Sequence, residues 1–153
     1  MIDPIDAKIL QELSRDSRQS VDRIAEQVGL SATPVRRRIK RLEEAGILIR
    51  YSIDIDMEKC GFGQLMYVYV KLKSRDRDTI SKFESRIQTL AEVSVCNLIT
   101  GGFDYFLEVR TKDMQSYNAF LRDVLAELPG VFGIETSVVI NPVKSEPFLP
   151  WPQ

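Results

Sequence analysis

Apolar side chains recur at helical spacing in three stretches of the first 50 residues. Residues that suit a helix start or end frame these stretches, namely Asp3, Pro4, Ser20, Gly29, Ser31 or Thr33, and Gly46. The apolar positions are Ile5, Ile9, Leu10 and Leu13, then Val21, Ile24, Ala25 and Val28, then Val35, Ile39 and Leu42. The pattern therefore predicts three helices, with a tight turn at residues 29–31 between the second and the third.

After Gly46 the period changes from that of a helix to that of a strand. Ile47, Ile49, Tyr51, Ile53 and Ile55 alternate with polar or less apolar positions. The segment DMEKCGFGQ (56–64) then brings two glycines and few apolar residues, which favours a domain boundary. We therefore predict one domain at residues 1–50, a strand and linker at 51–63, and a second domain at 64–153.

The second domain contains an internal repeat of 38 residues, marked by LAEV at 90–93 and LPGV at 128–131. The first half is predicted to form a strand, a helix and a strand at 65–73, 77–90 and 93–100. The second half repeats this order at 104–110, 114–128 and 131–141. Two such units in tandem predict a βαββαβ ferredoxin-like sandwich, so the chain as a whole belongs to the α+β class.

The first strand of this domain, LMYVYVKL (65–72), is apolar on both faces. In a ferredoxin-like sandwich the helices cover only one face of the sheet, and a bare second face would alternate with polar residues. A second copy of the same sheet is the simplest cover for the face that carries Tyr67 and Tyr69, which predicts a homodimer. The alternative is that both tyrosines are amphipathic surface residues.

Composition narrows the function. The chain is 44% hydrophobic and 28% charged, it has no apolar run of membrane-spanning length, and its start lacks a signal-peptide pattern, so we expect a cytoplasmic protein. It has no histidine, and the sequence contains no phosphate-binding glycine motif. Cys60 and Cys96 share no metal-ligand spacing. Chemistry by carboxylates alone stays open, but the spacing singles out no pair of acids. We therefore expect no catalytic residues, no metal site and no cofactor.

Positive charge gathers on one helix, although the formal net charge is −1. Residues 1–50 carry +2 and residues 51–153 carry −3, and five of the six residues 36–41 are basic. On a helical wheel Thr33, Arg37, Lys40 and Arg41 point away from the apolar stripe, and Arg36 and Arg38 sit on its flanks. Arg38, close to the stripe, is expected to pair with an acid of the first or second helix. A basic third helix on a three-helix frame predicts a helix-turn-helix whose third helix enters the DNA major groove.

The predicted DNA contacts divide along that helix. Its N-terminal end should reach base edges, and later positions should meet phosphates. The alternative is that the basic run is only a solvated helix face. The candidate base readers are Ser31, Ala32, Thr33, Arg36 and Arg37, and the candidate phosphate contacts are Lys40, Arg41 and Arg50.

These motifs resemble a known family. The patterns D-x-x-D-x-x-I-L-x-x-L (3–13), I-A-x-x-V-G-L-S (24–31), V-x-x-R-I-x-R-L-E-x-x-G-I (35–47) and T-G-G-F-D-Y (100–105) are similar to those of the Lrp/AsnC regulators. The resemblance covers nearly the whole chain in order. It implies a winged helix-turn-helix domain, a ferredoxin-like domain that pairs face to face, dimers that commonly assemble into octamers, and amino-acid effectors bound between dimers.

The resemblance also implies an effector site at Gly101, Gly102, Phe103, Asp104 and Tyr105, with Thr136 facing the same pocket. From the residues alone, a carboxylate heading an apolar strand needs a partner, and a ligand ammonium group would supply one. Exposed backbone N–H groups at the glycines would suit a ligand carboxylate. The alternative is a structural hairpin turn in which local backbone groups satisfy Asp104.

The function that we predict is a sequence-specific DNA-binding transcriptional regulator that responds to a small molecule, expected to be an amino acid. Its partners are then double-stranded DNA, a second copy of the chain and that amino acid, with no membrane contact. The alternative is an architectural DNA-binding protein without an effector. Sirohaem decarboxylases share this fold, but their chemistry needs haem ligands or acid/base groups, and a chain without histidine is poorly suited to it.

Overall fold

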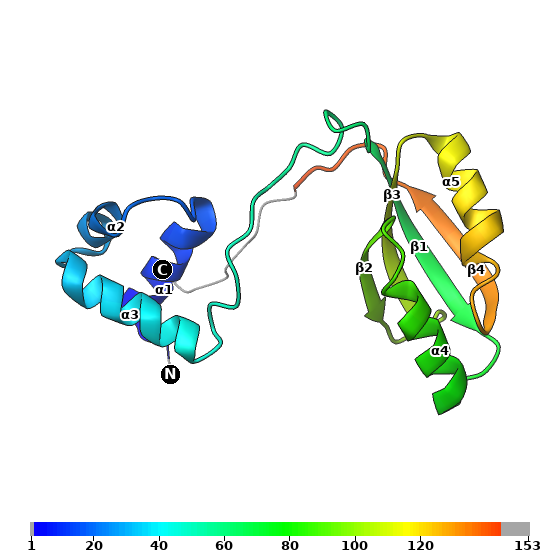
Figure 1. Ribbon diagram of the computed structural model, residues 1–153, viewed down its shortest axis with the longest axis horizontal. Helices are drawn as coiled ribbons and strands as arrows, with labels where there is room; N and C mark the ends of the chain where they lie inside the picture. The colour runs from blue at the N-terminus through cyan, green and yellow to red at the C-terminus, as the bar shows by residue number, and fades with distance from the viewer. Residues whose placement is uncertain (1, 145–153) are drawn as a thin grey trace. The chain divides into compact units, whose positions relative to one another are not determined.

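The computed structural model describes residues 2–144. Residues 2–54, with Lys144, belong to one compact unit, and residues 55–143 form another (Figure 1). The first unit is helical, and the second contains the sheet. The part of the predicted second domain at 145–153 lies outside the described residues.

The first unit contains the three predicted helices, α1 (Pro4–Arg15), α2 (Val21–Val28) and α3 (Ala32–Glu44). Asp3 caps α1 by accepting from the Asp6 N–H at 2.8 Å, and Ser20 caps α2 by accepting from the Arg23 N–H at 3.2 Å. Gly29 ends α2 with φ at +70°, a conformation that glycine adopts without strain. The three helices share one core, built around Ile9, Leu10, Leu13, Ile24, Ala25, Val35 and Leu42.

The predicted strand after Gly46 is wrong. Residues 49–56 form no regular secondary structure, although the apolar alternation is present in the sequence. A strand needs a neighbouring backbone to accept and donate its hydrogen bonds, and the described residues of this chain provide none for this segment. Its alternating side chains are instead exposed, with Ile49 at 85% and Ile53 at 74%.

The second unit follows the predicted βαββαβ order. Its elements are β1 (Gln64–Leu72), α4 (Arg77–Ile87), β2 (Val93–Leu98), β3 (Tyr105–Thr111), α5 (Met114–Phe120), the π-helical turn η1 (Leu121–Leu125) and β4 (Val131–Val138). The strands lie in the order β2-β3-β1-β4, and all three neighbouring pairs are antiparallel. The single predicted helix at 114–128 is thus shorter and changes its winding, because Ala126 donates to the carbonyl of Leu121 five residues earlier.

Both helices of the second unit cover the same face of the sheet (Figure 1). Met66, Val68, Val70 and Leu72 of β1 point into this core and are at most 6% exposed. They meet Phe83 and Ile87 of α4, Tyr117 and Phe120 of α5, and Tyr105, Leu107 and Val109 of β3. The opposite face of β1 carries Leu65, Tyr67 and Tyr69, as the alternation in the sequence predicts.

Two negative findings hold for residues 2–144. Within this range no helix combines the length and the apolar character that crossing a membrane requires. The same range brings no three metal-ligating side chains together into a candidate metal centre.

Candidate DNA interface and effector site

Helix α3 presents most of the predicted DNA contacts to solvent. Ser31, Thr33, Arg36, Arg37 and Lys40 are exposed, whereas Ala32 is half-buried. Ser31 occupies the N-cap position, but its side chain makes no capping hydrogen bond. The Ser31 hydroxyl therefore does not cap α3. Val35 and Leu42 fix the opposite side of the helix in the core, which orients the basic side outward.

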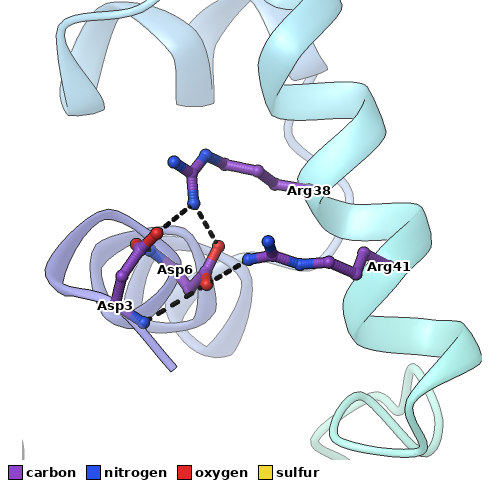
Figure 2. Close-up of polar contacts among 4 residues, drawn as sticks. All are labelled: Asp3, Asp6, Arg38 and Arg41. Carbon is purple, nitrogen blue, oxygen red and sulfur yellow. Dashed lines mark hydrogen bonds and ion pairs between the residues drawn. The ribbon is translucent and has the colours of Figure 1, made fainter. Parts of the chain in front are cut away.

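Two arginines of α3 turn toward α1 instead of pointing into open solvent (Figure 2). Arg38 Nη1 donates to Asp3 Oδ2 at 2.5 Å and to Asp6 Oδ1 at 2.8 Å. Arg41 Nη2 donates to the second carboxylate oxygen of Asp6. The prediction that Arg38 pairs with an acid of an earlier helix is confirmed. The same acid also holds Arg41, which the sequence had placed among the phosphate contacts.

Asp6 is fully buried, whereas Asp3 keeps part of its side chain in solvent. The hydrogen bond from Arg38 and that from the Asp6 backbone N–H lower the pKa of Asp3, and the same ion pair raises the pKa of Arg38. Because two acids face two arginines, this cluster carries no net charge. It joins the start of α1 to the middle of α3 and so orients α3 on α1.

Arg50 lies apart from the other candidate contacts. It is exposed in the irregular segment that follows α3, six residues beyond the last helical residue. Its reach toward a phosphate therefore depends on the course of that segment and not on the helix.

The predicted effector residues begin in the turn between β2 and β3. Gly101 and Gly102 are exposed, and Gly101 adopts φ of +123°, which side chains rarely tolerate. A Cβ atom added at either glycine would meet open space, so their backbone is accessible. Phe103 is half-buried and packs its ring 5.6 Å from that of Tyr69, on the face of the sheet away from the helices.

Asp104 is only 5% exposed, and its carboxylate is satisfied within the chain. Oδ2 accepts from the backbone N–H of Leu72 at 2.8 Å, and Oδ1 accepts from Arg75 Nε at 2.6 Å. The hydrogen bond from Leu72, followed by that from Arg75, lowers the pKa of Asp104. Leu72 and Arg75 therefore already supply partners for this acid, so its burial needs no ligand ammonium group, and contact of Asp104 with an effector stays a prediction.

Tyr105 and Thr136 are also engaged inside the unit. The Tyr105 hydroxyl lies 2.7 Å from Glu84 of α4, and the Thr136 hydroxyl contacts that of Tyr117 of α5. Both residues lie on the helix-covered face, since Tyr105 pairs with Val70 and Thr136 with Val68. The predicted effector residues thus fall into two groups, with the turn at the surface and Tyr105 and Thr136 beneath the helices.

The face of the sheet away from the helices carries an aromatic cluster, which we define as Tyr67, Tyr69, Phe103 and Phe106. Neighbouring rings lie 5.3 to 5.6 Å apart in tilted arrangements. Glu108 and Arg110 flank this cluster with an ion pair at 3.6 Å. The surface is therefore apolar at its centre and polar at its margin, which is the anatomy of a protein interface.

Sequence reasoning missed three residues that shape these sites. Asp6 reads as the usual acid of a first helical turn, and nothing local shows that two arginines more than 30 residues later reach it. Arg75 lies in a polar loop, 29 residues from Asp104. Glu84 sits on an otherwise ordinary helix face. Of these three residues, only Asp6 offered a signal in the sequence, because it follows Asp3 in the D-x-x-D pattern at a spacing of about one helical turn.

Comparison with known proteins covers both units. A family model described as winged helix-turn-helix DNA-binding matches residues 2–49, and one described as the Lrp/AsnC ligand binding domain matches residues 65–149. The chain is 38% identical to the leucine-responsive regulatory protein of Haemophilus influenzae over 97% of this chain and 89% of that protein. It is 39% identical to the Bkd operon transcriptional regulator of Pseudomonas aeruginosa over 93% of each.

A solved structure has the same fold. A transcriptional regulator from Neisseria meningitidis, crystallised as a complex with L-methionine, superimposes with a TM-score of 0.94 at 31% identity. The match covers 98% of this chain and 97% of that one, so it includes both units.

Proposed function

Since the chain belongs to the Lrp/AsnC family of transcriptional regulators, we propose that it is a sequence-specific DNA-binding regulator whose assembly or DNA affinity responds to an amino acid. The observation that carries the DNA-binding part is the exposed basic side of α3 on a capped three-helix frame. The relatives are named as regulators and not as enzymes, so the decarboxylase alternative is set aside.

In this proposal residues 1–50 bind DNA, and α3 enters the major groove. Ser31, Ala32, Thr33, Arg36 and Arg37 lie at or near its N-terminal end, which suits contact with base edges. Lys40 and Arg50 suit phosphates because both are exposed cations. Arg41 remains close to the same surface, but its pairing with Asp6 gives it a different role.

We assign oligomerisation to residues 64–153. The aromatic cluster on the open face of the sheet is apolar at its centre, and covering it with the same face of a second copy would bury Tyr67, Tyr69, Phe103 and Phe106. Burial of aromatic rings contributes strongly to interface stability. The chain is then a homodimer, and octamers of the kind implied by the family resemblance would require further contacts between dimers.

The effector is an amino acid held near Gly101 and Gly102. The relatives support this class of ligand, since one is named as leucine-responsive and another was solved with L-methionine. The exposed glycine backbone suits the ligand carboxylate. Arg75 adds a second group for it, because Nε is bound to Asp104 while residues 2–144 provide no partner for its two terminal nitrogens. Tyr105 and Thr136 then support the site from beneath.

One observation favours the alternative of an architectural DNA-binding protein without an effector. Asp104 has its partners inside the chain, so the fold does not depend on a ligand to satisfy it. The two functions differ in sequence selectivity and in ligand response. Selection of bound duplexes from a random library tests the proposal: a regulator enriches one motif and Arg37→Ala blurs it, whereas an architectural protein enriches none.

A further inference from the structure

The basic residues of α3 fall into two rows with different surroundings. Arg38 and Arg41 are three positions apart, so they lie one above the other on the side of α3 that faces α1. Arg36, Arg37 and Lys40 are the other basic residues of α3, and all three are exposed. Figure 2 shows the first row extending toward the start of α1, where both arginines end at carboxylates.

The carboxylate of Asp6 has both oxygens occupied by this row. Oδ1 binds Arg38 at 2.8 Å, Oδ2 binds Arg41, and the Asp6 side chain is 0% exposed. Asp3 adds a second acceptor for Arg38 and donates its backbone N–H to Asp6 Oδ2 at 3.3 Å. Every polar atom of the Asp6 carboxylate therefore has a partner within these helices.

The other row is free to meet a polyanion. Among the described residues, neither Arg36 nor Arg37 makes an ion pair, and both are exposed. Lys40 lies 3.7 Å from Glu44, but both side chains are exposed, at 74% and 66%, so water and DNA phosphates compete readily for that lysine.

Arg41 differs from Lys40 in the burial of its acidic partner. Its side chain is 57% exposed, yet the carboxylate that it binds is completely buried. A phosphate that bound Arg41 would remove one of the two arginines that pair with the buried Asp6 carboxylate, and water does not reach that carboxylate to replace it. Arg41 therefore stays on Asp6 when DNA approaches, and the charge of Asp6 cancels its attraction for the duplex.

We propose that Asp6 determines sequence specificity because its ion pair with Arg41 keeps that arginine from binding DNA phosphates. Asp6 and Asp3 together keep Arg38 from binding them in the same way. The recognition helix then holds phosphates through fewer cations than its sequence contains, so binding depends more on the base contacts of its N-terminal end. This inference rests on the proposed DNA-binding function. It assigns to a buried acid of α1 a role in limiting sequence-independent affinity.

The test compares neighbouring cations in the full chain with duplex DNA of random sequence. Fluorescence anisotropy across salt concentrations gives the slope of log affinity against log salt, which drops by about 0.9 for each lost phosphate contact. Lys40→Gln should lower the slope by that amount, and Arg41→Gln should leave it unchanged. An equal drop in both variants would overturn the proposal. Wild-type protein without salt-dependent binding would overturn the DNA-binding function, and this inference with it.

The second part of the test uses a variant that frees Arg41 from its ion pair with Asp6. Asp6→Asn keeps the shape of the side chain and frees Arg41, so the slope should steepen by about one unit and random-sequence affinity at low salt should rise. Glu26→Gln on α2 makes the same change in net charge at an exposed position and should alter the slope far less. If Asp6 has only a structural role, Asp6→Asn weakens binding with an unchanged slope, which rejects the proposal. If that variant does not fold, the comparison of Lys40→Gln with Arg41→Gln decides alone.

Discussion

The Nε atom of Arg75 lies 2.6 Å from a carboxylate oxygen of Asp104, so the acid that precedes β3 finds its cation inside its own unit. The second oxygen accepts from the backbone N–H of Leu72 at the end of β1. Asp104 therefore ties the turn after β1 to the start of β3. These two contacts make Asp104 a residue that stabilises the fold and orients Arg75.

Asp104→Asn should lower the free energy of unfolding by about 1–3 kcal/mol at neutral pH, the usual cost of weakening a buried hydrogen-bonded charge. Because the pKa of Asp104 is lowered in the folded state, its contribution is fully present above the pKa of an unfolded aspartate, about 3.9. The contribution is lost as pH falls through the lowered folded pKa. Urea unfolding at several pH values should show wild type and variant converging on the acid side, and a constant difference would contradict the assignment.

Arg75→Gln should weaken amino-acid binding, because it removes the two terminal donors proposed for the ligand carboxylate. A charged contact of this kind contributes about 2 kcal/mol or more, hence a loss of roughly 30-fold in affinity. Arg75→Lys keeps the charge but cannot bind Asp104 and a ligand with one forked group. Calorimetry on folded protein should therefore find both variants impaired, and wild-type affinity in either would exclude Arg75 as a ligand contact.

Arg37→Ala should reduce specific DNA affinity by about 1–3 kcal/mol and relax selectivity at one base position. The reason is its exposed place opposite the buried side of α3. Lys40→Ala should instead weaken all sequences alike and reduce the salt slope by about one unit. Binding assays on a selected duplex and its point variants check both. Should the two variants match wild type, α3 does not face DNA as proposed.

Tyr69→Asp should disrupt the proposed dimer, because it places a carboxylate among the rings of Phe103 and Phe106. Ser81→Asp, on an exposed position of α4, is the matched control and should leave assembly unchanged. Sedimentation velocity should show monomers, or loss of soluble protein, only for the first variant. An unaltered dimer would eliminate this face of the sheet as the contact.

Local rules predicted much of this fold. Asp3, Ser20 and Gly29 frame α1 and α2 as the capping pattern indicates, because these interactions involve residues only a few positions apart. The alternation in 65–72 likewise predicts which side chains of β1 enter the core. The residues from Ile47 to Ile55 show where such a rule fails, since a strand period predicts a strand only if a partner is present.

The candidate sites were harder to predict because their chemistry depends on distant pairs. The helical wheel turns Arg37, Lys40 and Arg41 outward. It is correct for Arg37 and Lys40, but it cannot reveal that Asp6 binds Arg41 across 35 residues and turns it toward α1. Likewise, the position of Asp104 before an apolar strand suggests an unpaired charge. The structure shows that Arg75 is its partner. Sequence therefore predicted which residue types gather at each site, and the structure supplied the pairing that decides what each one can do.

The most direct test of the central claim is the affinity of the purified protein for a duplex selected from a random library, measured by anisotropy with and without each of the amino acids. We expect salt-dependent binding of one preferred sequence, together with a change in affinity or in the size of the complex for at least one amino acid. Binding that shows no sequence preference, or that no amino acid alters in affinity or in size, would contradict the proposed function.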